Sequence, residues 1–357
     1  MEAIIERLEK LRDASAPMSL VTIRGIVVAT ILRMAPEIFE KKGLDGSRFR
    51  CSDSWLRQWL HRTLNWSERK ATRAGHKLPN DWEAQCERSF LRMAHDIKEH
   101  DIPEELVVNT DQAQGILAQG SSFTWAKTGS KQVSVVGAEE KRAITIVTSV
   151  SSSGVLLPFQ AVYEGKSSVS CPKQSAKCHT EATDAGFRFE YSGNHTYWST
   201  QKTMRSLVDD IIAPYFSEQK KKLGLPETQK SIWQIDVWSV HRSKEFRGWM
   251  KKTHPNIIVH YVPAGCTGVF QPCDVGMQRI MKHSLKRSCH RDVVDEILTQ
   301  VDGGKPNITV DKTIGVLRDR TVSWLWDAYK TLDDPRIVKK VSVNSSTASE
   351  TIVTHQM

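Results

Sequence analysis

Three aspartates occupy positions where carboxylates could act together on one reaction. Asp111 closes the apolar run LVVNTD, Asp236 closes SIWQID, and Asp274 lies in QPCDVG at the start of a predicted helix. Sites in open α/β sheets form beyond the carboxyl ends of strands, so these side chains can converge. Converging carboxylates repel one another, and hard divalent cations such as Mg²⁺ offset that repulsion. The pattern therefore favours a site where two ions about 4 Å apart stabilise the attacking and leaving oxygens of a phosphodiester.

The order of the predicted elements favours this shared site over the alternative, in which each aspartate is an ordinary turn or helix-capping residue. Short β-branched runs predict a meander of strands, at Leu106–Thr110, Gln132–Val136, Ala143–Val150 and Val155–Tyr163. Helices and strands then alternate, with helices at 204–215, Ser243–Lys252 and Gly276–His290 and strands at Ser231–Ile235 and Ile257–Val262. A meander followed by this alternation predicts an α/β fold, a mixed sheet with helices on its faces.

Residues 1–100 predict an all-helical region with a basic face. Ser52 or Asp53 can cap a helix in which Trp55, Trp59 and Leu60 are core positions. Eight bases and two acids lie between residues 47 and 77, and 8 − 2 gives +6 of the net charge of +9. Such a face on a helix pair enters the DNA major groove or contacts phosphates, and a merely basic surface is the alternative. The outward bases are Arg57, Arg62, Arg69 and Arg73.

Composition excludes several other classes of protein. Of the 357 residues 39% are hydrophobic, yet no apolar run approaches the ~18 residues of a membrane span. The start MEAIIERLEK mixes acidic and basic residues, unlike a secretory signal. The seven cysteines are scattered without a framework, so we expect reduced thiols in the cytosol or nucleus.

A cluster of basic residues follows Asp274 on the predicted helix. A solvated helix face and a set of phosphate contacts are both open interpretations of it. Its members are Lys282, His283, Lys286, Arg287, His290 and Arg291.

The segment from about Asp111 to Lys282 resembles the DDE superfamily endonuclease domain of pogo-like transposases. The motifs that carry the resemblance are VVNTD at Val107–Asp111, KTGSKQVSVVG at Lys127–Gly137, GVLLPFQAVYEGK at Gly154–Lys166, IDVWSVHRSKEF at Ile235–Phe246 and VPAGCTGVFQPCDVG at Val262–Gly276. Residues 20–90, which include CSDSWLRQWLHRTLNWSERKAT, resemble the centromere-protein-B-type helix-turn-helix that precedes this domain in the same transposases.

The resemblance implies a ribonuclease-H-like fold in which Asp111, Asp236 and Asp274 are the catalytic residues and hold two Mg²⁺ or Mn²⁺ ions. It implies cleavage and strand transfer of double-stranded DNA in the nucleus, with a homo-oligomer on DNA as a possible assembly and no membrane partner. Lys127 and Lys131 are then expected to line the cleft and contact phosphate, and a pair of solvated loop charges is the alternative. His241 is expected to contact phosphate or the metal site, and a capping or packing role is the alternative.

A second hypothesis is a transposase-derived DNA-binding protein whose catalytic site is idle. Two departures from the family pattern favour it, Gln112 where Glu is usual and Val237 where Asn is usual. In either case we expect four regions: helical DNA-binding residues 1–100, the endonuclease domain 101–295, a helical extension 296–340 and a disordered tail 341–357.

Overall fold

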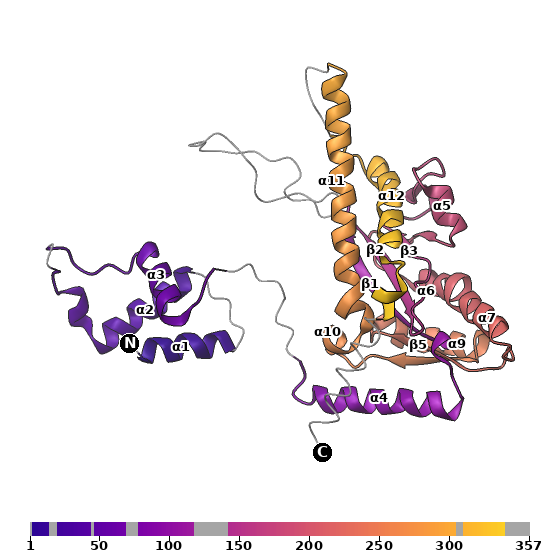
Figure 1. Ribbon diagram of the computed structural model, residues 1–357, viewed down its shortest axis with the longest axis horizontal. Helices are drawn as coiled ribbons and strands as arrows, with labels where there is room; N and C mark the ends of the chain where they lie inside the picture. The colour runs from indigo at the N-terminus through magenta and orange to yellow at the C-terminus, as the bar shows by residue number, and fades with distance from the viewer. Residues whose placement is uncertain are drawn as a thin grey trace. The chain divides into compact units, whose positions relative to one another are not determined.

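The computed structural model describes residues 2–13, 20–43, 46–68, 78–117, 142–304 and 310–339. The chain divides into two compact units, Met1–Lys77 and Leu78–Met357 (Figure 1). Several predictions lie outside the described residues: the strand Gln132–Val136, the bases Arg69, Arg73, Lys127 and Lys131, and the tail 341–357. Within the described ranges, no helix is long and apolar enough to cross a membrane.

The first unit contains the helices α1 (Glu2–Asp13), α2 (Leu20–Met34) and α3 (Asp53–Leu64), with a 3₁₀ turn η1 (Pro36–Phe39). Leu8, Val27 and Leu56, one from each helix, are buried in a shared apolar core. Ser52 caps α3, since its hydroxyl accepts a hydrogen bond from the Trp55 amide at 3.2 Å. The second helix of the predicted helix-turn-helix falls on residues 69–77, outside the described part of the chain.

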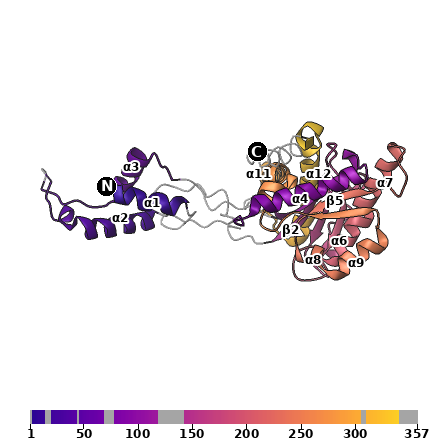
Figure 2. The ribbon, with the colours of Figure 1, turned by 90° about the horizontal axis from the view of Figure 1, so that it is seen from below.

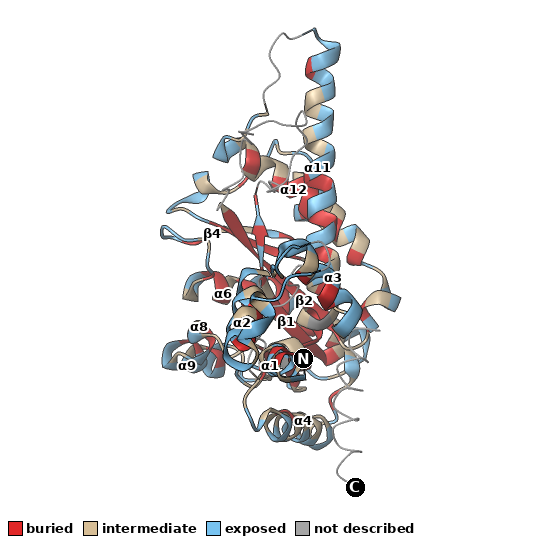
Figure 3. Cartoon of the chain, turned by 90° about the vertical axis from the view of Figure 1, so that its left-hand side faces the viewer, coloured by how far each residue is buried: buried red, intermediate tan, exposed pale blue. Residues whose placement is uncertain are grey.

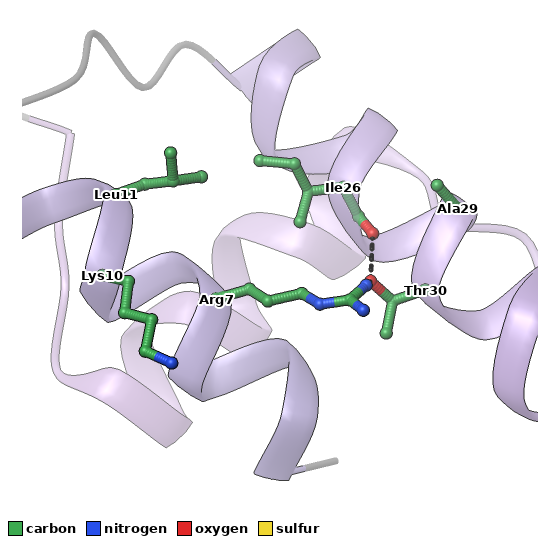
Figure 4. Close-up of a pocket in the computed structure, with 6 residues that line it drawn as sticks. All are labelled: Arg7, Lys10, Leu11, Ile26, Ala29 and Thr30. Carbon is green, nitrogen blue, oxygen red and sulfur yellow. Dashed lines mark hydrogen bonds between the residues drawn. The ribbon is translucent and has the colours of Figure 1, made fainter.

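A polar contact joins α1 to α2 at the edge of this core. Arg7 reaches from α1 and donates a hydrogen bond to the Thr30 hydroxyl at 2.7 Å, and Thr30 donates in turn to the Ile26 carbonyl (Figure 4). The contact satisfies the hydroxyl group of Thr30, a residue that is only 2% exposed.

A six-stranded mixed sheet forms the centre of the second unit. Its strands are β1 (Val107–Ile116), β2 (Ala143–Ser151), β3 (Gln160–Tyr163), β4 (Arg188–Tyr191), β5 (Ser231–Ile235) and β6 (Ile257–Tyr261). They lie side by side in the order β4-β3-β2-β1-β5-β6. The meander β1-β2-β3 is antiparallel, β5 and β6 are parallel to β1, and β4 is parallel to β3. This is the ribonuclease-H-like arrangement, with β4 added at the edge.

Helices cover both faces of the sheet (Figure 2). The remaining helical elements of the second unit are α4 (Trp82–Glu99), η2 (Glu104–Leu106), η3 (Ser168–Ser170), α5 (His179–Asp184), α6 (Gln201–Leu207), η4 (Val208–Ile212), α7 (Ala213–Lys222), α8 (Ser239–Arg242), α9 (Lys244–Thr253), α10 (Thr267–Phe270), η5 (Cys273–Met277), α11 (Gln278–Asp302) and α12 (Ile314–Leu332). Ile146 shares a core with Leu285 of α11 and Leu325 of α12, whereas Val147 on the other face packs with α6 and α7. Figure 3 shows the buried strands between these layers.

The observed elements differ from the predicted ones in the polar middle of the chain. The stretch 166–193 contains α5 and β4, which the sequence did not predict because their sequences HTEATD and RFEY are short and lack an apolar period. The predicted turn Ser151–Gly154 is present: the Ser151 amide donates to the Val155 carbonyl at 2.9 Å, and Gly154 has a φ of +101°.

The predicted helix Gly276–His290 is shorter than the observed one. A π turn, η5, precedes α11, and α11 itself continues to Asp302, through the expected boundary at residue 295. The following helix α12 contributes Leu317, Val322 and Leu325 to the core of the sheet. Residues 310–332 therefore complete one helical layer of the endonuclease fold.

Candidate active site

Asp111 lies in the middle of β1, so the prediction that it closes the first strand is wrong. β1 pairs with β5 only over Val107–Asn109, and its pairing with β2 continues to Ile116. The four residues after Asp111, Gln112 to Gly115, are not β-branched and have low strand propensity. They stay extended because they pair with β2. Asp111 nevertheless stands just beyond the shared β1–β5 ladder, and Asp236 directly follows β5. Both aspartates therefore belong to the same edge of the sheet, as predicted from the parallel arrangement.

The alternation of side chains along β1 assigns Asp111 to the face that α11 covers. Gln278 of α11 donates a hydrogen bond from its side-chain amide to the Asp111 carboxylate. The next residue, Gln112, points to the opposite face, where its amide contacts the Met204 sulfur at 3.8 Å. Gln112 is therefore a packing residue of the α6 face.

Asp274 is held near Asp111 because the chain around it is bonded directly to β1. The Gln271 side chain donates to the Thr110 carbonyl at 3.0 Å, and the Cys273 amide donates to the Asn109 side-chain oxygen at 3.2 Å. Asn109 also donates to the side chain of Gln234 in β5 at 3.2 Å. These buried bonds connect β1, β5 and η5. Asp111 lies in β1, Asp236 directly follows β5, and Asp274 lies in η5.

The charges of Asp274 and Asp236 both act on the carboxyl group of Asp111. Asp111 is 7% exposed and accepts a hydrogen bond from the Gln112 amide at 2.8 Å. Burial raises the pKa of Asp111 well above its ordinary value, and the charges of Asp274 and Asp236 raise it further. Asp111 therefore experiences the expected repulsion from neighbouring carboxylates. The convergence of all three aspartates on one site stays a prediction.

Asp236 is positioned by His241 of α8. The His241 ring nitrogen Nδ1 lies 3.0 Å from the Asp236 carboxylate oxygen Oδ1 and 3.2 Å from its carbonyl oxygen. The ring is 2% exposed and packs against Trp233, Trp238 and Phe246. This burial corrects the expectation that His241 contacts DNA phosphate, because the ring has no surface to offer, and it favours the alternative in which His241 packs and orients Asp236.

The donor set fits a hard divalent cation. The Asp274 charge raises the pKa of the buried Asp111, and a cation bound by both carboxylates would relieve that repulsion. In the side-chain arrangement of the described residues, no three carboxylate, imidazole or thiol groups form a ready metal cluster. The third aspartate, Asp236, instead faces His241.

The remaining candidate residues belong to the first unit or fall outside the described residues. Arg57 and Arg62 lie on the exposed face of α3, and Arg57 has an ion pair with Glu68 at 3.4 Å. Trp59 and Leu60 occupy the opposite, buried face, as predicted. Sequence reasoning missed Gln278, although its spacing of four residues after Asp274 could have placed both on one helical face.

The second unit thus combines a mixed ribonuclease-H-like sheet with one carboxylate within β1, one directly after β5 and one on η5. The model of the family "DDE superfamily endonuclease" matches residues 140–338, and the chain belongs to this family. The match includes Asp236 and Asp274 and begins after Asp111. It confirms the predicted resemblance; the pogo-like and centromere-protein-B-type assignments stay predictions.

Solved structures of similar fold share little sequence with the chain. A Mos1 transposase paired-end complex with the left transposon end has 9% identity and a TM-score of 0.48, covering 85% of this chain and 70% of that one. The catalytic domain of Mos1 mariner transposase has 9% identity and a TM-score of 0.44, covering 79% and 97%. A Mos1 mariner paired-end complex with Mn has 9% identity and a TM-score of 0.45, covering 99% and 92%. No curated protein matches the chain.

Proposed function

We propose that the protein is a metal-dependent DNA endonuclease of the transposase type. The observation that carries the proposal is the buried Asp111 carboxylate, whose pKa is raised by burial and by the charges of Asp274 and Asp236. A carboxyl group whose pKa is shifted by burial and by neighbouring charges is more common at functional sites than elsewhere. Membership of the DDE superfamily endonuclease family supports the same reaction class.

In this proposal Asp111, Asp236 and Asp274 hold two Mg²⁺ or Mn²⁺ ions. Such ions supply charge stabilisation for the attacking and leaving oxygens of a phosphodiester. The chain contributes position: Gln278 orients Asp111, His241 orients Asp236, and Gln271 and Asn109 hold the turn that carries Asp274. Water is the attacking group for cleavage and a DNA 3′-hydroxyl for strand transfer, so no side chain acts as a nucleophile.

The proposal includes double-stranded DNA as substrate and partner, the exposed bases of α3 as a second DNA contact, and the nucleus as the location. It treats Gln112 as no obstacle to catalysis, because this side chain contacts Met204 on the face opposite Asp111. An idle catalytic site is therefore the less favoured alternative.

A nicking assay on supercoiled DNA tests the proposal. We expect nicking with Mg²⁺ or Mn²⁺ and none with chelator, and we expect Ca²⁺ to permit binding without cleavage because its coordination is longer and looser. Asp236→Asn should abolish nicking and leave folding and DNA binding intact, since it removes a charge with almost no change of shape. Asp184→Asn, on the exposed face of α5, is the matched control and should nick like the wild type.

Two results would contradict the proposal. Wild-type protein that binds DNA and shows no cleavage in Mn²⁺ would establish the idle-site alternative. Nicking that persists in Asp236→Asn would show that another site or a contaminant is responsible.

A further inference from the structure

The solvent-exposed side of α11 is basic over its first half. Every exposed residue between Gln278 and Arg291 is an arginine, a lysine or a histidine. We call these seven residues the α11 basic face: Arg279, Lys282, His283, Lys286, Arg287, His290 and Arg291. The spacing is that of one side of a helix, and the other side, which includes Met281 and Leu285, is buried against the sheet.

Few of these charges are neutralised within the protein. The sequence between Gln278 and Arg291 contains no acidic residue. Arg291 pairs with Asp327 of α12, and Lys282 donates to the side-chain oxygen of Gln278 at 3.3 Å. Within the described part of the chain, the other five side chains of the face have no hydrogen bond or ion pair. The face therefore presents concentrated, unpaired positive charge to solvent.

The far end of the face opens into a polar hollow between α11 and α12. The hollow has a volume of about 300 Å³. Its lining combines three bases, two hydroxyl residues and one acid: Arg287, Arg291, Lys330, Ser288, Thr331 and Asp327. Asp327 is already shared between Arg291 and Lys330, so the net charge of the lining is positive. Phosphate oxygens are the chemical complement of such a lining.

The character of the exposed side changes abruptly beyond Arg291. The exposed residues of the second half include Val294, Asp295, Leu298 and Val301. A helix that needed charge only for solubility would carry mixed charges along its whole length. The bases are instead confined to the half of α11 that begins at the candidate active site, where Gln278 donates to Asp111.

We propose that the α11 basic face binds the sugar-phosphate backbone of duplex DNA that extends from the active site along the helix. The inference rests on the proposed function, because it takes DNA as the substrate held at Asp111. Twelve helical steps from Arg279 to Arg291 span about 18 Å, which corresponds to about five phosphates of one strand. The face contains no Trp, Tyr or Phe, and grooves for single-stranded DNA need such stacking platforms. A straight row of bases without aromatics fits a duplex.

The salt dependence of DNA binding by the full chain tests this surface. The test variant combines Arg279→Gln, Lys286→Gln and Arg287→Gln, and the matched control combines Lys221→Gln, Lys251→Gln and Lys252→Gln on α7 and α9, all exposed bases. Binding to a fluorescent duplex is measured in chelator over a salt series, so that no cleavage occurs. If the three bases contact phosphates, the slope of log K against log salt should become shallower by about 2.7. The control should keep the wild-type slope.

Each outcome decides the inference. The inference would be overturned if the test variant kept the wild-type salt slope, or if the control variant lost as much slope as the test variant. It would also be overturned if the test variant lost as much slope on single-stranded DNA as on duplex DNA. The single variant Lys286→Gln, with the melting temperature of the wild type as a check on folding, should lose about 0.9 in slope. Because binding is measured without metal, a slope loss in a protein that never nicks DNA would support this surface while the proposed catalytic function fails.

Discussion

Asp111 carries a charge that opposes folding. Its pKa is raised in the folded protein by burial first, then by Asp274 and Asp236. A carboxyl group with a raised folded pKa binds its proton more tightly when folded, so its stability contribution falls as pH rises above the unfolded value of about 3.9. Above the folded pKa the full destabilisation is present. A bound divalent cation would remove much of it.

Replacing this charge should stabilise the protein in the absence of metal. We expect Asp111→Asn to raise the free energy of unfolding at neutral pH in chelator by about 0.5–2 kcal/mol, since Gln278 can turn its amide oxygen toward the new amide. The advantage should shrink as pH falls toward the unfolded pKa. Urea unfolding at several pH values measures it, and a variant less stable than the wild type at neutral pH would contradict the argument.

Added metal provides the matched comparison. Mg²⁺ or Mn²⁺ should raise the melting temperature of the wild type, because ligands that bind only the folded state stabilise it, and should raise that of Asp111→Asn less. Equal stabilisation of both proteins would place the bound metal elsewhere.

The aspartates are positioned by β1, β5 and η5. The sequence pattern predicted some of these elements better than others. The strands ending at Ile235 and Tyr261 are short runs dominated by β-branched and aromatic residues, so their existence and the place of Asp236 followed directly. The second half of β1 was not predictable, because its residues have low strand propensity and are kept extended by pairing with β2. The role of Gln278 was hidden for a different reason: it depends on η5 and α11 packing against β1, which only the tertiary fold specifies.

The buried amide network between these elements predicts a second mutational effect. Asn109→Ala removes an acceptor from the Cys273 amide and a donor to Gln234, leaving buried groups unsatisfied. We expect a loss of about 1–3 kcal/mol in the free energy of unfolding. Nicking should also fall, because the turn that carries Asp274 loses its bond to β1.

Gln114→Ala on the same strand is the control. Gln114 is exposed and donates to the Tyr197 hydroxyl at 2.7 Å, so its removal should cost only about 0.5–1.5 kcal/mol and leave nicking unchanged. Chemical unfolding and the nicking assay measure both variants. If Asn109→Ala nicked DNA at the wild-type rate, the network would be structural and would not position Asp274.

At the scale of the whole molecule, the chain joins a helical unit to an endonuclease unit. The α/β class and the meander followed by alternation were predictable, since they depend on local periodicity. The packing of α11 and α12 against the same sheet was not predictable from the sequence. The Gly- and Pro-rich stretch Gly303–Pro306 resembles a domain boundary, and only the buried residues of α12 reveal the shared core. Charge is also divided, with one basic face in each unit, on α3 and on α11.

Two basic faces in separate units should contribute independently to DNA binding. Arg57 and Arg62 lie exposed on α3, and Arg57 has only a long, exposed pair with Glu68. If both contact phosphates, Arg57→Gln combined with Arg62→Gln should make the salt slope shallower by about 1.8, and cleavage at saturating DNA should continue because the carboxylates are untouched. Arg12→Gln with Arg33→Gln, exposed bases of α1 and α2, is the control and should change neither quantity. Adding the α3 changes to the α11 variant should sum the two slope losses if the two faces share no phosphate contacts, because independent sites behave additively. A wild-type slope in the α3 variant would leave α3 as a merely basic surface and assign DNA binding to the endonuclease unit.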